Sequence, residues 1–345
     1  MDMNGRTSNY SNQIIDIRSD AEEKSLLETT KECLKQSGDR APTFPHELLW
    51  DEDGLKGFEK ITYLEDYYLT HNEIGLLEQH ADEIVLSIKP NSVLIELGSG
   101  NLRKIKILLH ALDKQGRAAD YYALDLNLSE LQRSLASVPP GTFQHVRCHG
   151  LLGTYDDARC WLERSEIIQR NKCVISLGSS IGSFTRSEAP QFLSGFAELL
   201  NRSCNGHSGK LANTMIVGLD ACKSPSRLDR AYNDPYGVWN EFILNGLKHA
   251  NALLGYDAFR EEDWSVEGRW NRGNGCYERY LVPLREVFFE EVRFEAGEKI
   301  FISHSCKYDV VEQAQLWDRA GIEELVHWTT EDGCYGIHLL STKKH

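Results

Sequence analysis

Short apolar runs alternate with amphipathic stretches between residues 88 and 225. Each apolar run has the length of a buried strand, and each following stretch has apolar residues at helical spacing. Strands that alternate with helices in this way are typical of a parallel sheet with helices on both faces. The predicted strands lie within residues 92–100, 121–127, 143–150, 173–183 and 214–223, and the predicted helices within residues 103–115, 129–138, 156–165 and 186–200.

The segments on either side have other patterns. Residues 1–20 are polar and predict a loose arm, and residues 22–36 predict a helix. Broken helices follow, and Thr70 and Glu73 have the spacing of a capping box that opens a helix running to about residue 88. After residue 225, a helical segment precedes a stretch whose alternation is typical of antiparallel strands.

We therefore expect an α/β fold, in which a doubly wound Rossmann-like sheet is joined to a smaller mixed α+β domain that caps it. The expected parts are an arm and helix in residues 1–45, a helical segment that lines the pocket in 46–87, the doubly wound domain in 88–225, the cap in 226–310 and a return to the main domain in 311–345.

Composition narrows the range of partners. The chain has 38 Lys and Arg against 52 Asp and Glu, a net charge of −14, so it repels a phosphate backbone and we expect no nucleic-acid partner. No apolar run approaches the ~20 residues that a membrane helix needs. The N-terminus lacks the basic and apolar regions of a signal peptide, so we expect no membrane partner and a cytoplasmic location.

Cysteine and histidine patterns give no metal site. The nine cysteines lie singly, without a C-x-x-C pair, so we expect reduced thiols rather than a zinc ribbon. His145 and His149 are four residues apart, but no Glu lies between them and their segment is predicted to be a strand. We therefore expect no metal.

The sequence ELGSG follows the first predicted strand of the sheet. Gly98 and Gly100 allow a sharp turn and close approach of a ligand to the backbone. Asp125 ends the next strand, where a carboxylate is placed to accept hydrogen bonds from ribose hydroxyls. Neither a complete G-x-G-x-x-G nor a P-loop is present. The short glycine turn together with Asp125 therefore favours S-adenosylmethionine over NAD as the cofactor.

The chain resembles the histidine-specific N-α-methyltransferase family. It is most similar in its motifs to the fungal members, which include enzymes that methylate dimethylallyltryptophan. The resemblance covers the chain from about residue 48 onward, through the blocks ELGSGN, YALDLN, HGLLGTYDD, LGSSIGSFT, GLDACK, RLDRAYND and FEAGEKIFISHSCKY. It implies an S-adenosylmethionine-dependent enzyme of this fold. The cofactor residues that it implies are Trp50, Phe58, Gly98, Lys104, Asp125 and Leu151.

The resemblance also implies a substrate pocket. Its residues are Tyr67, which would orient the amine and is the candidate catalytic residue, with Tyr232, Ser183, Arg279, Ser303 and Ser305. The family pattern has Asn at the position of Ser183 and Glu at that of Ser303. A neutral serine cannot accept a charge-assisted bond from an imidazole N–H as a carboxylate does, so we expect histidine not to be the preferred substrate. Arg279 either points inward, favouring an acidic or strongly hydrogen-bonding acceptor, or points to solvent and pairs with an acid such as Glu278.

Three functions follow from this resemblance. The first is an N-methyltransferase for the α-amine of an amino acid or derivative other than histidine, such as a tryptophan-like one, in fungal specialised metabolism. The second is a histidine Nα-methyltransferase that forms hercynine. The third is an inactive cofactor-binding regulatory subunit. In the first two, the partner is a small-molecule amine, and we expect a monomer.

Overall fold

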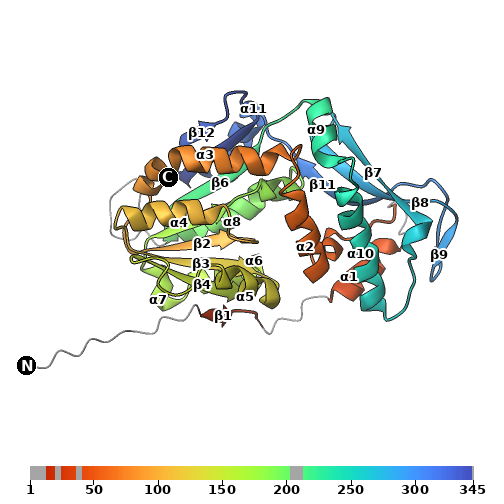
Figure 1. The fold of residues 1–345 in the computed structure, drawn as a ribbon, viewed down its shortest axis with the longest axis horizontal. Coiled ribbons are helices and arrows are strands. Elements are labelled where there is room, and N and C mark those ends of the chain that lie inside the picture. Colours follow the sequence, from red (N-terminus) through yellow and green to blue (C-terminus); the bar gives the residue numbers. More distant parts are fainter. Residues whose placement is uncertain (1–12, 20–24, 36–40, 203–212, 344–345) are drawn as a thin grey trace, which may run out of the picture.

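The computed structural model describes residues 13–19, 25–35, 41–202 and 213–343. Its main feature is a sheet of eight strands in the order β1-β4-β3-β2-β5-β6-β13-β12 (Figure 1). The five central strands are parallel, whereas β13 is antiparallel to both β6 and β12. The strands are β1 (Ile14–Asp16), β2 (Ser92–Leu97), β3 (Ala119–Asp125), β4 (Val146–Leu152), β5 (Lys172–Ser176), β6 (Thr214–Asp220), β12 (Ile322–Thr329) and β13 (Tyr335–Thr342). The doubly wound α/β fold predicted from the apolar runs is confirmed.

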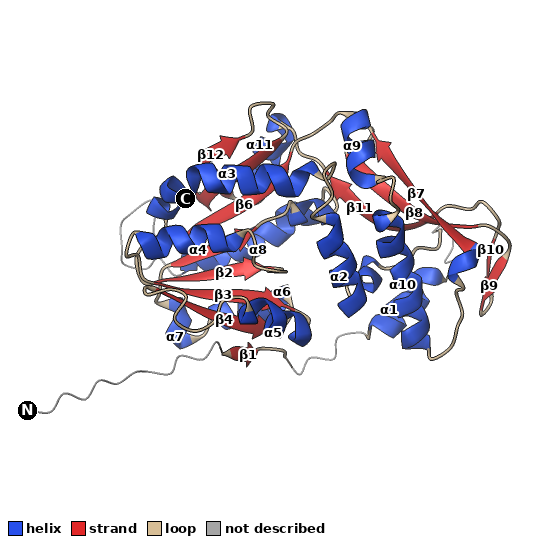
Figure 2. Ribbon diagram, in the orientation of Figure 1, coloured by secondary structure: helices blue, strands red, loops and turns tan. Residues whose placement is uncertain are grey.

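Helices cover both faces of this sheet, as Figure 2 shows. One apolar cluster joins one face to helices such as α3 and α4, and a second joins the other face to helices such as α8 and α11. The strands are buried on both sides, which explains their nearly continuous apolar sequence. The helices around the sheet are α3 (Tyr68–Ile84), η2 (Val85–Ser87), α4 (Ile105–Lys114), α5 (Leu128–Ala136), α6 (Tyr155–Leu162), α7 (Ser165–Ile168), η3 (Ser180–Ser183), α8 (Glu188–Arg202) and α11 (Val310–Arg319).

A smaller part lies beyond the carboxyl ends of the parallel strands (Figure 1). It holds a three-stranded antiparallel sheet in the order β11-β8-β7 and a two-stranded sheet of β9 and β10. Helix α10 packs on α2, η1 and β7, so segments from before and after the main domain build this part together. Its elements are α1 (Leu26–Leu34), η1 (His46–Leu49), α2 (Glu52–Ile61), α9 (Pro225–Tyr232), α10 (Val238–Leu254), η4 (Glu261–Asp263), β7 (Trp264–Asn271), β8 (Cys276–Pro283), β9 (Val287–Phe289), β10 (Val292–Phe294) and β11 (Ile300–Cys306).

The expectation of a loose arm over residues 1–20 is wrong at its end. Residues 14–16 form strand β1, which pairs in parallel with β4, and Ile17 beyond it is buried. Gly150 and Gly153 leave the space that Ile14 and Ile17 occupy, so these apolar residues have a reason to be ordered. Residues 1–12 lie outside the described residues.

The predicted capping box at Thr70 and Glu73 is also wrong. Helix α3 begins at Tyr68 after the N-cap Tyr67, so both residues lie inside the helix, where their side chains are buried. Glu73 has no exposed surface and serves the site described below.

Two of the cysteines are not reduced. Cys276 and Cys306 face each other across β8 and β11 and form a disulfide, contrary to the expectation from sequence. Cysteines far apart in sequence reveal no pairing until the strands that carry them are aligned. Cys204 lies outside the described residues.

Among the residues that the structure describes, no helix is long and apolar enough to cross a membrane.

Candidate active site

The turn after β2 has the backbone that its glycines permit. Gly98 and Gly100 have φ angles of 70° and 53°, in the left-handed region that favours glycine. The backbone N–H groups of Gly98 and Ser99 both donate to the carbonyl of Leu124 on β3, at 3.1 and 3.2 Å. These bonds hold the turn beside the end of β3, where Asp125 lies.

Asp125 retains capacity to accept hydrogen bonds. Its Oδ1 accepts from the backbone N–H of Asn127 at 3.0 Å, and burial raises the pKa of the carboxyl. Tyr155, which sequence reasoning missed, lies beside this turn, since a Cβ placed on Gly98 would be 3.4 Å from its hydroxyl. The carboxylate of Asp125 can accept hydrogen bonds from the ribose of a nucleoside cofactor, and the glycines of the adjacent turn allow the cofactor to approach the protein backbone.

Glu73 joins several elements behind this turn. One carboxylate oxygen accepts from the Tyr335 hydroxyl at 2.8 Å, and the other is 2.7 Å from the Lys104 ammonium. Both oxygens also accept from the backbone N–H of Gly178, at 2.8 and 2.9 Å. Lys104 is therefore held by an ion pair, and its side chain remains partly exposed.

Leu151 lies near the end of β4, and its side chain is buried. It has no exposed surface and packs in the core cluster on one face of the sheet. Because successive side chains of a strand point to opposite faces, a residue in the middle of a buried run can fill the core instead of the crevice. The side chain of Leu151 therefore fills the core, and the cofactor contact expected of this residue, through its backbone, stays a prediction.

Aromatic rings connect the cofactor side to the cap. The Trp50 and Phe58 ring centres are 5.2 Å apart, and Phe58 lies 6.4 Å from Tyr67. Tyr67 lies 5.9 Å from Tyr232 with the rings nearly perpendicular, and Trp239 packs against both. The structure therefore brings together aromatic residues that lie far apart in the sequence.

A buried ion pair underlies this aromatic group. Lys307 has no exposed surface, and its ammonium lies 2.7 Å from Asp220 Oδ2 at the end of β6. It also donates to the hydroxyls of Tyr232 and Ser305, at 2.6 and 2.9 Å, so its three N–H donors all have partners. Sequence reasoning missed this lysine, although it stands within the S-C-K block that carries Ser305.

Arg279 points inward. It is 2% exposed, its guanidinium lies 4.1 Å from the centre of the Trp239 ring, and one N–H donates to the backbone carbonyl of Tyr232. Glu278 instead pairs with Arg269, at 3.3 Å, so the alternative of a solvent-facing Arg279–Glu278 pair is wrong. Among the described residues, Nε and Nη1 of Arg279 have no hydrogen-bond partner, and burial lowers its pKa to about 10.

The predicted serines differ in position. Ser305 accepts from the Tyr232 hydroxyl at 3.0 Å, and Ser303 lies opposite Arg279 in the register of β11 and β8. Ser183 at the end of η3 is exposed, and its hydroxyl donates to the carbonyl of Ser180 at 2.7 Å. Its hydroxyl is therefore used within its own turn.

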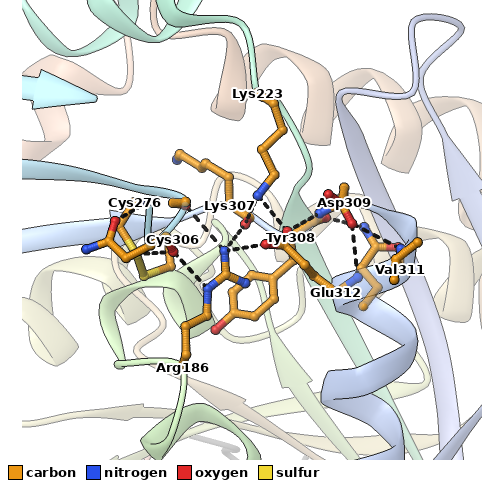
Figure 3. Close-up of polar contacts among 12 residues, drawn as sticks. Arg186, Lys223, Cys276, Cys306, Lys307, Tyr308, Asp309, Val311 and Glu312 are labelled. Atoms are coloured by element: carbon orange, nitrogen blue, oxygen red, sulfur yellow. Dashed lines mark hydrogen bonds and ion pairs between the residues drawn. A yellow bond between two sulfur atoms is a disulfide. The ribbon is translucent and has the colours of Figure 1, made fainter. Parts of the chain in front are cut away.

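The backbone carbonyl of Lys307 accepts hydrogen bonds from two further cationic side chains. Figure 3 shows Arg186 and Lys223 converging on its carbonyl oxygen, at 2.5 and 2.8 Å. Both cations also pair with Glu312, at 3.0 and 2.5 Å. A cavity of about 570 Å³ adjoins this group, between α11 and the turn joining β7 to β8. Lys307 is thus fixed at both its main chain and its ammonium.

Comparisons with known proteins agree with this geometry. The family described as histidine-specific, SAM-dependent methyltransferases matches residues 26–342. Ergothioneine biosynthesis protein 1 of Neurospora crassa is 45% identical over 98% of this chain, which spans only 37% of that longer protein.

Two further fungal relatives match nearly end to end. The 4-dimethylallyltryptophan N-methyltransferase easF of Claviceps fusiformis is 35% identical over 93% of each chain. N-methyltransferase imqF of Aspergillus flavus is 33% identical over 94% of this chain and 87% of its own. The glycine turn, the acid at the end of β3 and these matches agree, and the chain belongs to the family of histidine-specific, S-adenosylmethionine-dependent methyltransferases.

Proposed function

We propose that this protein methylates the α-amine of an amino acid or amino-acid derivative other than histidine. The observation that carries the proposal is the inward Arg279, whose Nε and Nη1 nitrogens have no hydrogen-bond partner among the described residues. A buried guanidinium with unpaired donors favours an acceptor whose side chain carries a carboxylate or another strong hydrogen-bond acceptor, and it repels an imidazolium.

The proposed roles divide between the two parts of the molecule. Gly98, Lys104 and Asp125 would hold the cofactor, with Trp50 and Phe58 against it. S-adenosylmethionine supplies an activated methyl group on its sulfonium. The acceptor would lie on the cap side, against the residues Tyr67, Tyr232, Arg279, Ser303 and Ser305.

Tyr67 would orient the amine rather than remove its proton. Burial raises the pKa of its hydroxyl well above the usual value, so the hydroxyl stays protonated and can donate or accept a hydrogen bond. The amine must reach the methyl group with its lone pair free, and alignment of the two groups is the contribution that these rigid aromatic residues can make.

A second candidate is methylation of histidine. It is favoured by the 45% identity to ergothioneine biosynthesis protein 1, which exceeds the 35% to easF. The easF and imqF relatives instead support a role in fungal specialised metabolism. Arg279 and Ser303 decide our preference, since neither offers the carboxylate that would bind an imidazole N–H.

Mass spectrometry of parallel incubations tests the choice. The protein and S-adenosylmethionine would be incubated with separate pools of histidine, aromatic, prenylated tryptophan, acidic and aliphatic amino acids. We expect a methyl-mass increment on a non-histidine pool, lost in Asp125→Ala and reduced at least tenfold in Arg279→Met. An increment on histidine alone would refute the proposed specificity. No increment on any pool, with intact cofactor binding, would favour the inactive regulatory subunit.

A further inference from the structure

The last two strands of the main sheet carry a polar cluster that methyl transfer does not use. Glu324 and His327 lie on β12, and His338 lies on β13. The sequence gives no metal-ligand spacing here, because His338 is separated from the other two residues by a turn and half a strand. Only the pairing of the strands brings the three side chains together.

An irregularity in β12 places them on one face. Glu324 lies opposite Leu340, and His327 lies opposite His338, with the register shifting by one residue near Leu325. Leu340 and His338 are two residues apart on β13, so they share a face of the sheet. Their partners Glu324 and His327 must therefore share that face too. In a regular strand, two residues three positions apart lie on opposite faces, so it is the irregularity that aligns them.

The resulting distances are short. The Nδ1 atom of His327 lies 2.6 Å from one oxygen of Glu324, and that of His338 lies 2.6 Å from the other. All three ligand atoms lie within 4.8 Å of one another. His338 is 1% exposed and packs against Trp317, so its ring is fixed, while the His327 side chain is 53% exposed and leaves the cluster open to solvent.

We propose that Glu324, His327 and His338 form a binding site for one divalent transition-metal ion of the zinc type. Two imidazole nitrogens and one carboxylate are ligands that zinc, cobalt and nickel share, whereas magnesium and calcium prefer oxygen alone. The ion takes the Nδ1 lone pairs, any displaced proton moves to Nε2 or to solvent, and water fills the remaining positions. Bound in this way, it ties the edge strand β12 to β13.

The test compares the wild type with His327→Gln, using Zn²⁺ in equilibrium dialysis and Co²⁺ as a spectroscopic probe. His327 is half exposed, so this variant should fold, and thermal unfolding without metal checks that it does. His145→Gln, which changes an exposed histidine directly before β4, is the matched control. We expect one ion per chain in the wild type and control, with Kd at least tenfold weaker in His327→Gln.

Two further readouts separate this site from adventitious binding. Co²⁺ should give visible absorption bands in the wild type that Glu324→Gln lacks, and saturating Zn²⁺ should raise the melting temperature by about 2–4 °C only where the site is intact. Equal affinity of the wild type and His327→Gln would overturn the proposal, because the ion would then be held elsewhere, for example by free cysteines. No binding below about 100 μM would also overturn it, and would leave an ion-paired cluster only.

Discussion

Single residues in this protein act through partners far away in the sequence. Lys307 and Asp220 are both fully buried and pair at 2.7 Å, and the lysine also positions the Tyr232 hydroxyl. A buried charge is tolerated only when its partner is present, so each member of the pair depends on the other.

Removing both charges of this pair should therefore cost less than the two single removals added together. Lys307→Met leaves the Asp220 carboxylate buried without its cation, and we expect the free energy of unfolding to fall by about 3–5 kcal/mol. In the double variant with Asp220→Asn, the Asn amide can still hydrogen-bond to Tyr68, so the loss should be clearly smaller than the sum of the single losses. Urea unfolding of the four proteins measures this coupling, and strict additivity would show that the pair does not act as a unit.

Glu96 gives a pH-dependent prediction at the same scale. Burial raises the pKa of this carboxyl to about 8, even though Tyr121 donates to it at 2.5 Å. Between about pH 5 and pH 8 the folded protein then holds a proton that the unfolded chain has lost, so stability falls as pH rises through this range. Glu96→Gln has no such proton and should gain stability relative to the wild type, on the order of 3 kcal/mol from pH 5 to pH 8.

Urea unfolding at a series of pH values measures this difference. The exposed variant Glu163→Gln is the control and should follow the wild type. A constant difference between wild type and Glu96→Gln at every pH would contradict the assignment of the proton to Glu96.

At the scale of elements, the packing of α3 on the sheet depends on one strand residue without a side chain. A Cβ on Gly218 in β6 would overlap a carboxylate oxygen of Glu73 and lie 2.9 Å from the Tyr335 hydroxyl. The missing side chain makes room for the carboxylate that holds Lys104 and Gly178. A glycine inside a strand is otherwise unfavourable, which supports this steric reason.

Gly218→Ala should displace Glu73 and lower the free energy of unfolding by about 2–4 kcal/mol. Gly75→Ala is a matched control, because a Cβ there meets no atom within 4 Å and the residue lies within α3. Alanine in a helix is favoured over glycine, so the control should gain about 0.5–1 kcal/mol. Equal effects of the two substitutions in thermal unfolding would show that the space at Gly218 is not required.

At the scale of the whole molecule, the site is divided between two parts. Of the proposed cofactor residues, Gly98, Lys104 and Asp125 lie at the strand ends of the main sheet, whereas the proposed acceptor residues Tyr232, Arg279 and Ser305 lie on α9 and the small antiparallel sheet. Asp220 on β6 and Lys307 after β11 join the two parts through their ion pair. Binding of cofactor and binding of acceptor should therefore respond to different substitutions.

S-adenosylhomocysteine should stabilise the protein by about 2.7 kcal/mol at 100 times its Kd. Asp125→Ala should abolish that gain, while Tyr232→Phe should keep it and raise the KM of the acceptor about tenfold. Thermal unfolding with and without ligand, together with steady-state kinetics, measures both effects. A loss of cofactor-dependent stabilisation in Tyr232→Phe would contradict the division of roles.

The fold could be predicted to a large extent because it depends on local patterns. Buried parallel strands must be apolar throughout, and their helices must be amphipathic, so periodicity reports both. The glycine turn at Gly98 and the acid at Asp125 were likewise readable, since each stands at the end of a strand that the pattern predicts. The arm was misread because β1 is short and is stabilised by its pairing with β4 rather than by its own pattern.

The sequence alone determined the alternation of strands and helices between residues 88 and 225, the glycine turn and the family resemblance, because these depend on neighbouring residues. Only the tertiary structure showed that Glu73 is a buried carboxylate bonded to several elements rather than a residue of a helix capping box. It also showed that Cys276 and Cys306 form a disulfide and that Arg279 faces inward. It also brought His338 to Glu324 and His327 through a shift in strand register. These features depend on contacts between residues that are distant in the sequence, and such contacts leave no periodic trace along the chain.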